Sequence, residues 1–208
     1  MDLKRSMRDG RHRLWLALAR RGNEDAFRRL YGELYGPVAR YVAARTAQRE
    51  DAEDLTAEVF HKLVAELDRY DRTSGSVLTW LLAMARNAVI DHHRRRRAYG
   101  SARERTVPVE EMADLLAAAP DDPLGRLVRD EDLRGLERLV WRLPAETREM
   151  FALRFGEGLS VREVAGVMGL AEDAAKQRFA RAFRKIRSEL SAPRPAREEG
   201  GPACVTSD

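Results

Sequence analysis

Two short segments of the chain concentrate side chains that bind phosphates and nucleobases. Residues 94–97 are four consecutive arginines, and residues 176–187 place lysine, arginine and glutamine among apolar residues. Arginine forms paired hydrogen bonds with phosphate and with guanine, and glutamine does so with adenine. Because the formal net charge of the whole chain is only +4, the clustering of charge indicates a polyanionic partner, and nucleic acid before a membrane surface.

The second segment belongs to a sequence that is typical of a helix–turn–helix. Ser160 and Glu163 have the spacing of a capping box, which begins a helix, and Gly169 stands where a left-handed residue lets the chain turn. A second amphipathic helix follows. In such a motif the second helix lies in the DNA major groove.

Successive helical residues point about 100° apart, which sets a basic face opposite the apolar side of this second helix. An ordinary charged helix is the alternative interpretation, but the coincidence of capping box, glycine and basic face favours DNA binding. The candidate contacts to bases and phosphates are Lys176, Gln177, Arg178, Ala180, Arg181 and Arg184.

The four arginines end another predicted helix, over residues 77–97. Its apolar residues share one side, while cations and an amide share the other: Arg86, Asn87, Arg94 and Arg97. Phosphates bind such cations, and unstacked bases can lie on aromatic rings. Trp80, at the edge of this face, fits either base stacking or the core, and the core is favoured.

The triplet Asp91-His92-His93 in the same helix imitates a metal-binding motif of phosphoesterases. Adjacent helical side chains diverge by about 100°, and the neighbouring arginines repel a divalent cation. We therefore predict no metal site, no cofactor and no catalytic residues.

These segments must be positioned by helices. Charged residues make up 35% of the 208 and aromatic residues 7%, and no strand pattern stands out, so we predict an all-α fold of two small helical domains. The expected divisions are an N-terminal arm (1–13), a first domain (14–99), a flexible linker with one helical turn near 112–116 (100–123), a second domain (124–190) and a disordered tail (191–208).

Within the first domain, apolar residues from Phe27 to Val42 recur at helical spacing. Gly36-Pro37 interrupts them, which predicts two helices, the second opening at the proline. A further helix is expected over residues 51–67, followed by a polar loop over 71–76.

Cellular context follows from weaker signals. The single cysteine, Cys204, fits a reducing cytoplasm. No apolar run approaches the roughly 20 residues that cross a bilayer, and the first residues lack the pattern of a secretory signal. We expect a cytoplasmic protein without membrane insertion.

Four stretches, in this order and spacing, together resemble bacterial RNA polymerase sigma factors of the extracytoplasmic-function group. The opening helices of the family's second domain resemble RGNEDAFRRLYGELYGPVARYV (21–42), and its polymerase-binding helix resembles DAEDLTAEVF (51–60). The promoter-melting helix resembles GSVLTWLLAMARNAVIDHHRRRR (75–97). The fourth domain resembles residues 143–187.

The resemblance implies roles for individual residues. Contacts to core RNA polymerase would come from Asp51, Asp54 and Glu58. Contacts to the minus-ten element of promoter DNA would come from Ser74, Ser76, Trp80, Arg86, Asn87, Arg94, Arg95 and Arg97. The helix–turn–helix residues would read the minus-thirty-five element. An anti-sigma factor is a further expected partner.

These observations lead to one main hypothesis, a dissociable subunit that gives polymerase its promoter specificity and is not an enzyme. A stand-alone helix–turn–helix regulator is the alternative, but it leaves the acidic helix and the arginine helix unexplained. A decoy that sequesters an anti-sigma factor is a third, less favoured interpretation.

Overall fold

The computed structural model describes residues 3–71, 75–98 and 139–190, and the regular elements found in these ranges are helices. The predicted all-α fold is confirmed. In chain order the elements are α1 (Leu3–Ala19), α2 (Glu24–Ala43), α3 (Arg49–Ala65), the short η1 (Leu67–Arg69), α4 (Val77–Ala98), α7 (Ala145–Phe151), the π-helical η3 (Ala152–Gly156), α8 (Val161–Met168) and α9 (Glu172–Leu190).

Several predictions of the sequence lie outside the described residues. These are the linker over 100–123 with its turn near 112–116, the start of the second domain, Ser74, and the tail with Cys204.

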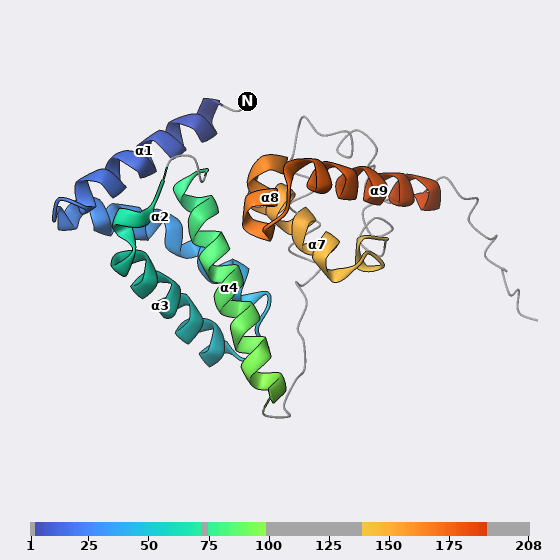
Figure 1. Ribbon diagram of the computed structural model, residues 1–208, viewed down its shortest axis with the longest axis horizontal. Helices are drawn as coiled ribbons and strands as arrows, with labels where there is room; N and C mark the ends of the chain where they lie inside the picture. Colours follow the sequence, from blue (N-terminus) through green and yellow to red (C-terminus); the bar gives the residue numbers. More distant parts are fainter. Residues whose placement is uncertain (1–2, 72–74, 99–138, 191–208) are drawn as a thin grey trace, which may run out of the picture.

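A first module is formed by α1 to α4 (Figure 1). The helices α2, α3 and α4 pack on one another, and α1 lies along α2. Their apolar stripes meet in a core whose largest fully buried side chains include Leu30, Leu34, Leu63 and Leu81. Burial of such side chains contributes about 1.5–3 kcal/mol each, so this core fixes the positions of α3 and α4.

The break predicted at Gly36-Pro37 is wrong, because α2 runs unbroken through Pro37. A proline inside a helix costs about 3 kcal/mol. Leu34 and Val38 on either side of it are both 0% exposed, and a single continuous helix keeps them on one buried face. Tertiary packing therefore outweighs the local preference.

Helix α1 begins at Leu3, so the boundary drawn at residue 14 falls inside a helix. Leu16 is buried in the core. His12 is buried as well, with its Nε2 atom 2.8 Å from a carboxylate oxygen of Glu33 on α2. Burial lowers the pKa of His12, and the bond to Glu33 opposes this. Residues predicted as an arm thus contribute to the first module.

A second module is formed by α7, η3, α8 and α9. Phe151 lies at its centre, with the rings of Phe155, Phe179 and Phe183 at centroid distances of 5.3–5.5 Å. Aromatic pairs at such distances add stability beyond their buried area. This cluster holds α9 against α7 and η3.

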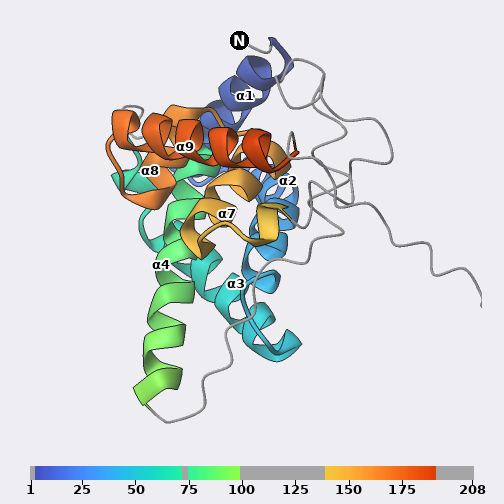
Figure 2. The same cartoon turned by 90° about the vertical axis from the view of Figure 1, so that its right-hand side faces the viewer.

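The two modules are in contact through α4 and α8 (Figures 1 and 2). Buried apolar residues of both helices belong to one continuous core. None of the helices in the described ranges is both long and apolar enough to cross a membrane.

Candidate nucleic-acid interface

The helix–turn–helix is formed by α8 and α9, and its turn has the predicted chemistry. The Ser160 side chain accepts a hydrogen bond from the backbone N–H of Glu163 at 3.3 Å, and the Ser160 N–H donates to the Glu163 carboxylate at 2.9 Å. Gly169 ends α8 with φ of 66°, a left-handed conformation that glycine adopts without strain. The predicted capping box and glycine turn are confirmed.

Helix α9 turns its apolar residues inward: Ala175, Phe179, Ala182 and Ile186 are buried. Five of its six candidate DNA-binding residues are exposed, namely Lys176, Gln177, Ala180, Arg181 and Arg184, and Arg178 is half-buried. The fold thus presents a basic, hydrogen-bonding face of the kind that enters a major groove.

Two of these cations already have acidic neighbours. Lys176 Nζ lies 2.8 Å from Glu172, and this hydrogen bond raises the pKa of Lys176. Arg178 Nη1 lies 2.7 Å from Glu146 on α7. These pairs are solvent-exposed and therefore weak, so a DNA phosphate can replace the carboxylate.

The outer face of α4 carries the second set of candidates. Asn87, Arg94, Arg95 and Arg97 are exposed. Arg86 differs from them, because its side chain is only 20% exposed and its Nε atom lies 3.6 Å from Glu149 of the second module. Most residues predicted for the DNA-binding face of α4 are therefore exposed together on that helix, whereas the Arg86 side chain points toward the Glu149 carboxylate.

The start of α4 is closed off in this conformation. Ser76 is 3% exposed, and its hydroxyl accepts the Thr79 N–H at 3.1 Å, which caps the helix. Trp80 is partly buried against the core, with its ring 5.4 Å from that of Tyr70. A nucleobase cannot reach the Ser76 hydroxyl here, and Trp80 offers only part of its surface.

The acidic residues of α3 separate into two groups. Asp54 and Glu58 are exposed. Asp51 instead points toward α4, where it accepts a hydrogen bond from Arg96 at 2.6 Å and lies 3.5 Å from His92. Asp51 therefore joins α3 to α4. Among the described residues, no cluster of three or more His, Cys, Asp or Glu side chains could hold a metal ion.

Comparison with known proteins assigns this architecture to a family. The model of Sigma-70 region 2 matches residues 30–99, and that of Sigma-70 region 4 matches residues 133–186. The RNA polymerase sigma factor CarQ of Myxococcus xanthus is 30% identical over 82% of this chain and 92% of its own. The ECF RNA polymerase sigma factor BldN of Streptomyces coelicolor is 34% identical over 81% of this chain. The chain belongs to the extracytoplasmic-function sigma factors.

Solved structures are similar to this sigma factor along most of its length. CnrH, in complex with the cytosolic domain of CnrY, has a TM-score of 0.53 and 25% identity, and covers 88% of this chain and 98% of its own. RpoE of Bartonella quintana, in complex with the anti-sigma factor NepR, has a TM-score of 0.53 at 21% identity, covering 81% and 98%, and supports the fold alone. The sigma factor spans 61% of the length of BldN.

Sequence reasoning missed the residues that join the two modules. Glu149 on α7 bonds Tyr41 of α2, 108 positions away, and Glu163 bonds Thr79, 84 positions away. Such pairs leave no local pattern, because neither helical period nor capping chemistry depends on residues so distant.

Proposed function

We propose that this sigma factor binds core RNA polymerase and directs it to promoters, where it supports DNA melting and transcription initiation. It acts by binding and not as an enzyme, and it works in the cytoplasm. The observation that carries the proposal is the pair of basic faces, one on α4 and one on α9, in separate modules of a sigma-factor fold. Two faces fit two promoter elements.

Helix α9 is proposed to hold the minus-thirty-five element as intact duplex. Gln177, Arg181 and Arg184 have the side chains that read adenine and guanine edges, and all three are exposed. Lys176 and Arg178 are placed to contact phosphates, and Ala180 leaves room for the bases. Phosphate contacts set the register, and base contacts select the sequence.

Helix α4 is proposed to bind the non-template strand at the minus-ten element. Opening the duplex costs about 1.4 kcal/mol per base-pair step, whereas each base captured on an aromatic side chain returns about 1–3 kcal/mol. Trp80, the loop with Ser74 and Ser76, and the cations Arg86, Arg94, Arg95 and Arg97 with Asn87 are the candidates for this capture.

The exposed acids of α3, Asp54 and Glu58, are proposed to contact polymerase, with Asp51 beside them. Their helix is anchored by buried Leu55, Val59 and Leu63, so it presents the acids rigidly. An anti-sigma factor is a further proposed partner, in line with the complex of CnrH with the cytosolic domain of CnrY.

Run-off transcription tests this function. Core polymerase is mixed with genomic promoter fragments, with and without the sigma factor, and we expect specific transcripts only when it is present. The Asp54→Lys/Glu58→Lys variant should fail to associate with polymerase while keeping its helical content. If the chain instead binds a specific operator tightly and never confers start sites on polymerase, it is a stand-alone regulator.

A further inference from the structure

The contact between the two modules has opposite charges on its two sides. Carboxylates come from the second module, at Glu149, Glu157 and Glu163. Cations come from the first, at Arg5, Arg40, Arg45 and Arg86. The first module thus meets a row of anionic oxygens, which is also what a DNA backbone presents.

Glu149 is the centre of one group of contacts. Its Oε1 accepts a hydrogen bond from the Tyr41 hydroxyl, and the same oxygen lies 3.5 Å from Arg45 Nε and 3.6 Å from Arg86 Nε. Burial raises the pKa of Tyr41, so the phenol remains a donor at neutral pH. Two arginines of the first module are therefore held by one carboxylate of the second.

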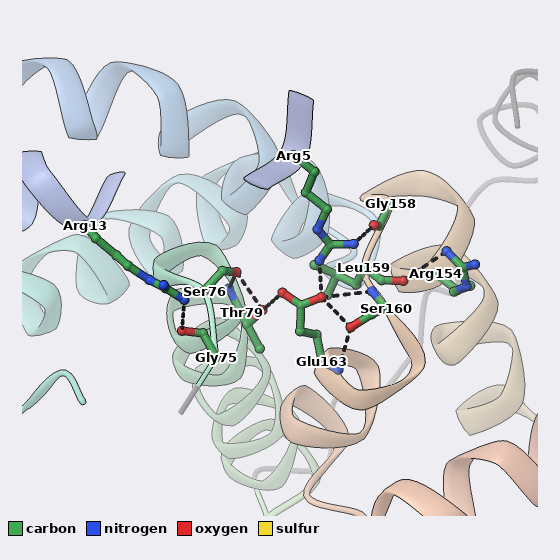
Figure 3. A network of polar contacts seen from close by, with 10 residues as sticks. All are labelled: Arg5, Arg13, Gly75, Ser76, Thr79, Arg154, Gly158, Leu159, Ser160 and Glu163. Carbon is green, nitrogen blue, oxygen red and sulfur yellow. Dashed lines mark hydrogen bonds and ion pairs between the residues drawn. The ribbon is translucent and has the colours of Figure 1, made fainter. Parts of the chain in front are cut away.

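Glu163 is the centre of another group (Figure 3). The Thr79 hydroxyl on α4 donates to Glu163 Oε1 at 3.1 Å, and the Arg5 guanidinium on α1 bonds the other oxygen and the Gly158 carbonyl. Because Glu163 also completes the capping box of α8, the first helix of the DNA-binding motif is tied directly to the start of α4.

The contact leaves some donors unsatisfied. Arg45 Nη2 and Arg86 Nε are buried without a hydrogen-bond acceptor, since the Arg86 Nε to Glu149 distance of 3.6 Å is too long for a hydrogen bond. A buried donor without a partner has lost its hydrogen bonds to water and gained none in return, which disfavours the arrangement that buries it. The closed arrangement therefore stabilises the arginines incompletely, and a phosphate with several free oxygens can bind them better.

Geometry makes this contact incompatible with promoter binding. The names of the minus-ten and minus-thirty-five elements give positions roughly 25 base pairs apart, which is about 85 Å of duplex at about 3.4 Å per base pair. Here α8 and α4 touch, with Gly166 of α8 positioned so that an added Cβ would lie 3.8 Å from the Thr79 methyl. The modules must separate before both elements can be engaged.

We propose that this sigma factor carries its own inhibitory contact, in which Glu149 takes the place of a DNA phosphate at Arg45 and Arg86. In the closed conformer the second module covers Arg86 and the start of α4. Opening exchanges the carboxylate for DNA. The effect on transcription rests on the proposed function, whereas the effect on binding of single-stranded DNA by the chain alone does not.

A reversible disulfide tests the contact. Thr79→Cys and Gly166→Cys are introduced together in a Cys204→Ser background. A Cβ added at Gly166 lies 3.8 Å from the Thr79 methyl carbon, which is itself bonded to the Thr79 Cβ, so a small shift brings the two positions within reach of a disulfide. We expect the oxidised form to lose run-off transcription and the reduced form, which lacks the Thr79 hydroxyl bond to Glu163, to transcribe at least as well as Cys204→Ser. Because both forms are one polypeptide, misfolding of the variant cannot produce the difference.

The same pair is assayed without polymerase, by fluorescence anisotropy of a labelled single-stranded oligonucleotide. We expect the oxidised form to bind more weakly than the reduced form. Equal binding by both forms would overturn the inference, as would failure of the two thiols to cross-link under oxidant. If transcription is absent even with the unmodified chain while the binding difference persists, the proposed function fails and the inhibitory contact stands.

Two substitutions that each remove one negative charge separate this role from an effect of net charge. Glu149→Gln weakens the hold on Arg45 and Arg86, and we expect tighter oligonucleotide binding. Glu189→Gln removes the same charge from a pair with Arg142 within the second module, and it should bind as the unmodified chain does. Identical affinities for the two variants would contradict the proposal.

Discussion

Arg181 and Gln177 stand on the exposed side of α9, and their side chains form no hydrogen bond or ion pair with any described residue. Lys176 and Arg178, by contrast, each have a carboxylate partner. A cation that must exchange one partner for another gains less on binding than one that exchanges only water. Among single residues, Arg181 should therefore contribute more to DNA binding than Lys176 or Arg178 does.

If Arg181 pairs with a base edge, Arg181→Ala should weaken binding to the promoter by about 1–3 kcal/mol. Transcription from cognate promoters should then fall roughly 5- to 150-fold. Run-off transcription on a cognate and a scrambled minus-thirty-five element measures it. Binding to polymerase should be unchanged, because the proposed polymerase contacts lie on α3, which the substitution on α9 does not alter. Arg187→Ala, on the same helix but outside the candidate set, is the control, and an equal loss in both variants would argue against base reading by Arg181.

At the scale of elements, α8 shows how local chemistry fixes a binding motif. The Ser160 capping box starts the helix, and Gly169 ends it in a left-handed conformation. Nothing lies within 4 Å of a Cβ added at Gly169, so its requirement comes from the backbone and not from crowding. The turn then directs α9 outward with its basic face exposed.

The same substitution should have opposite effects at two glycines. Gly169→Ala forces an L side chain into a φ of 66° and should destabilise the fold by roughly 1–2 kcal/mol. Gly32→Ala lies inside α2 with open space around it and should stabilise by roughly 0.5–1 kcal/mol. Urea denaturation followed by circular dichroism checks both. A loss of stability at Gly32 equal to that at Gly169 would refute the backbone argument.

At the scale of the whole molecule, two carboxylates between the modules respond to pH in opposite directions. Burial tends to raise the pKa of Glu163, but hydrogen bonds from Ser160 and the charge of Arg5 outweigh it and hold that pKa below its usual range. Burial raises the pKa of Glu157, and the neighbouring Arg40 offsets this only in part. Ionised Glu163 therefore stabilises the folded chain, whereas ionised Glu157 is disfavoured in it.

The pH dependence of unfolding tests this difference. The stabilisation from Glu163 is present above its unfolded pKa, near 4.3, and is lost as the pH falls through the lower folded value. The difference in free energy of unfolding between the unmodified chain and Glu163→Gln should thus become smaller below about pH 4. For Glu157→Gln the pH dependence is opposite. Because the pKa of Glu157 is raised in the folded chain, the unmodified chain becomes more stable relative to Glu157→Gln as the pH falls. Parallel pH profiles for the two variants would contradict the assignment.

Local patterns in the sequence were enough to predict several helix boundaries and the exposed face of α9. The helical period predicted the arginine helix over residues 77–97, observed as Val77–Ala98. Capping chemistry predicted the start of α8, and glycine predicted its end. Exposure of Gln177, Arg181 and Arg184 followed from helical geometry alone. These features succeed because each depends on residues within one or two turns of each other.

Packing between helices decided the continuity of α2, the place of the N-terminal residues and the partners of two predicted site residues. Packing of Leu34 and Val38 kept α2 continuous through Pro37, and burial of Leu16 and His12 drew the N-terminal residues into the first module. Arg86 and Asp51 were predicted as contacts for DNA and polymerase. Here Arg86 instead forms an ion pair with Glu149, and Asp51 accepts a hydrogen bond from Arg96. Electrostatic attraction between groups more than 40 positions apart is set by where the helices lie in space, and no local pattern in the chain encodes it.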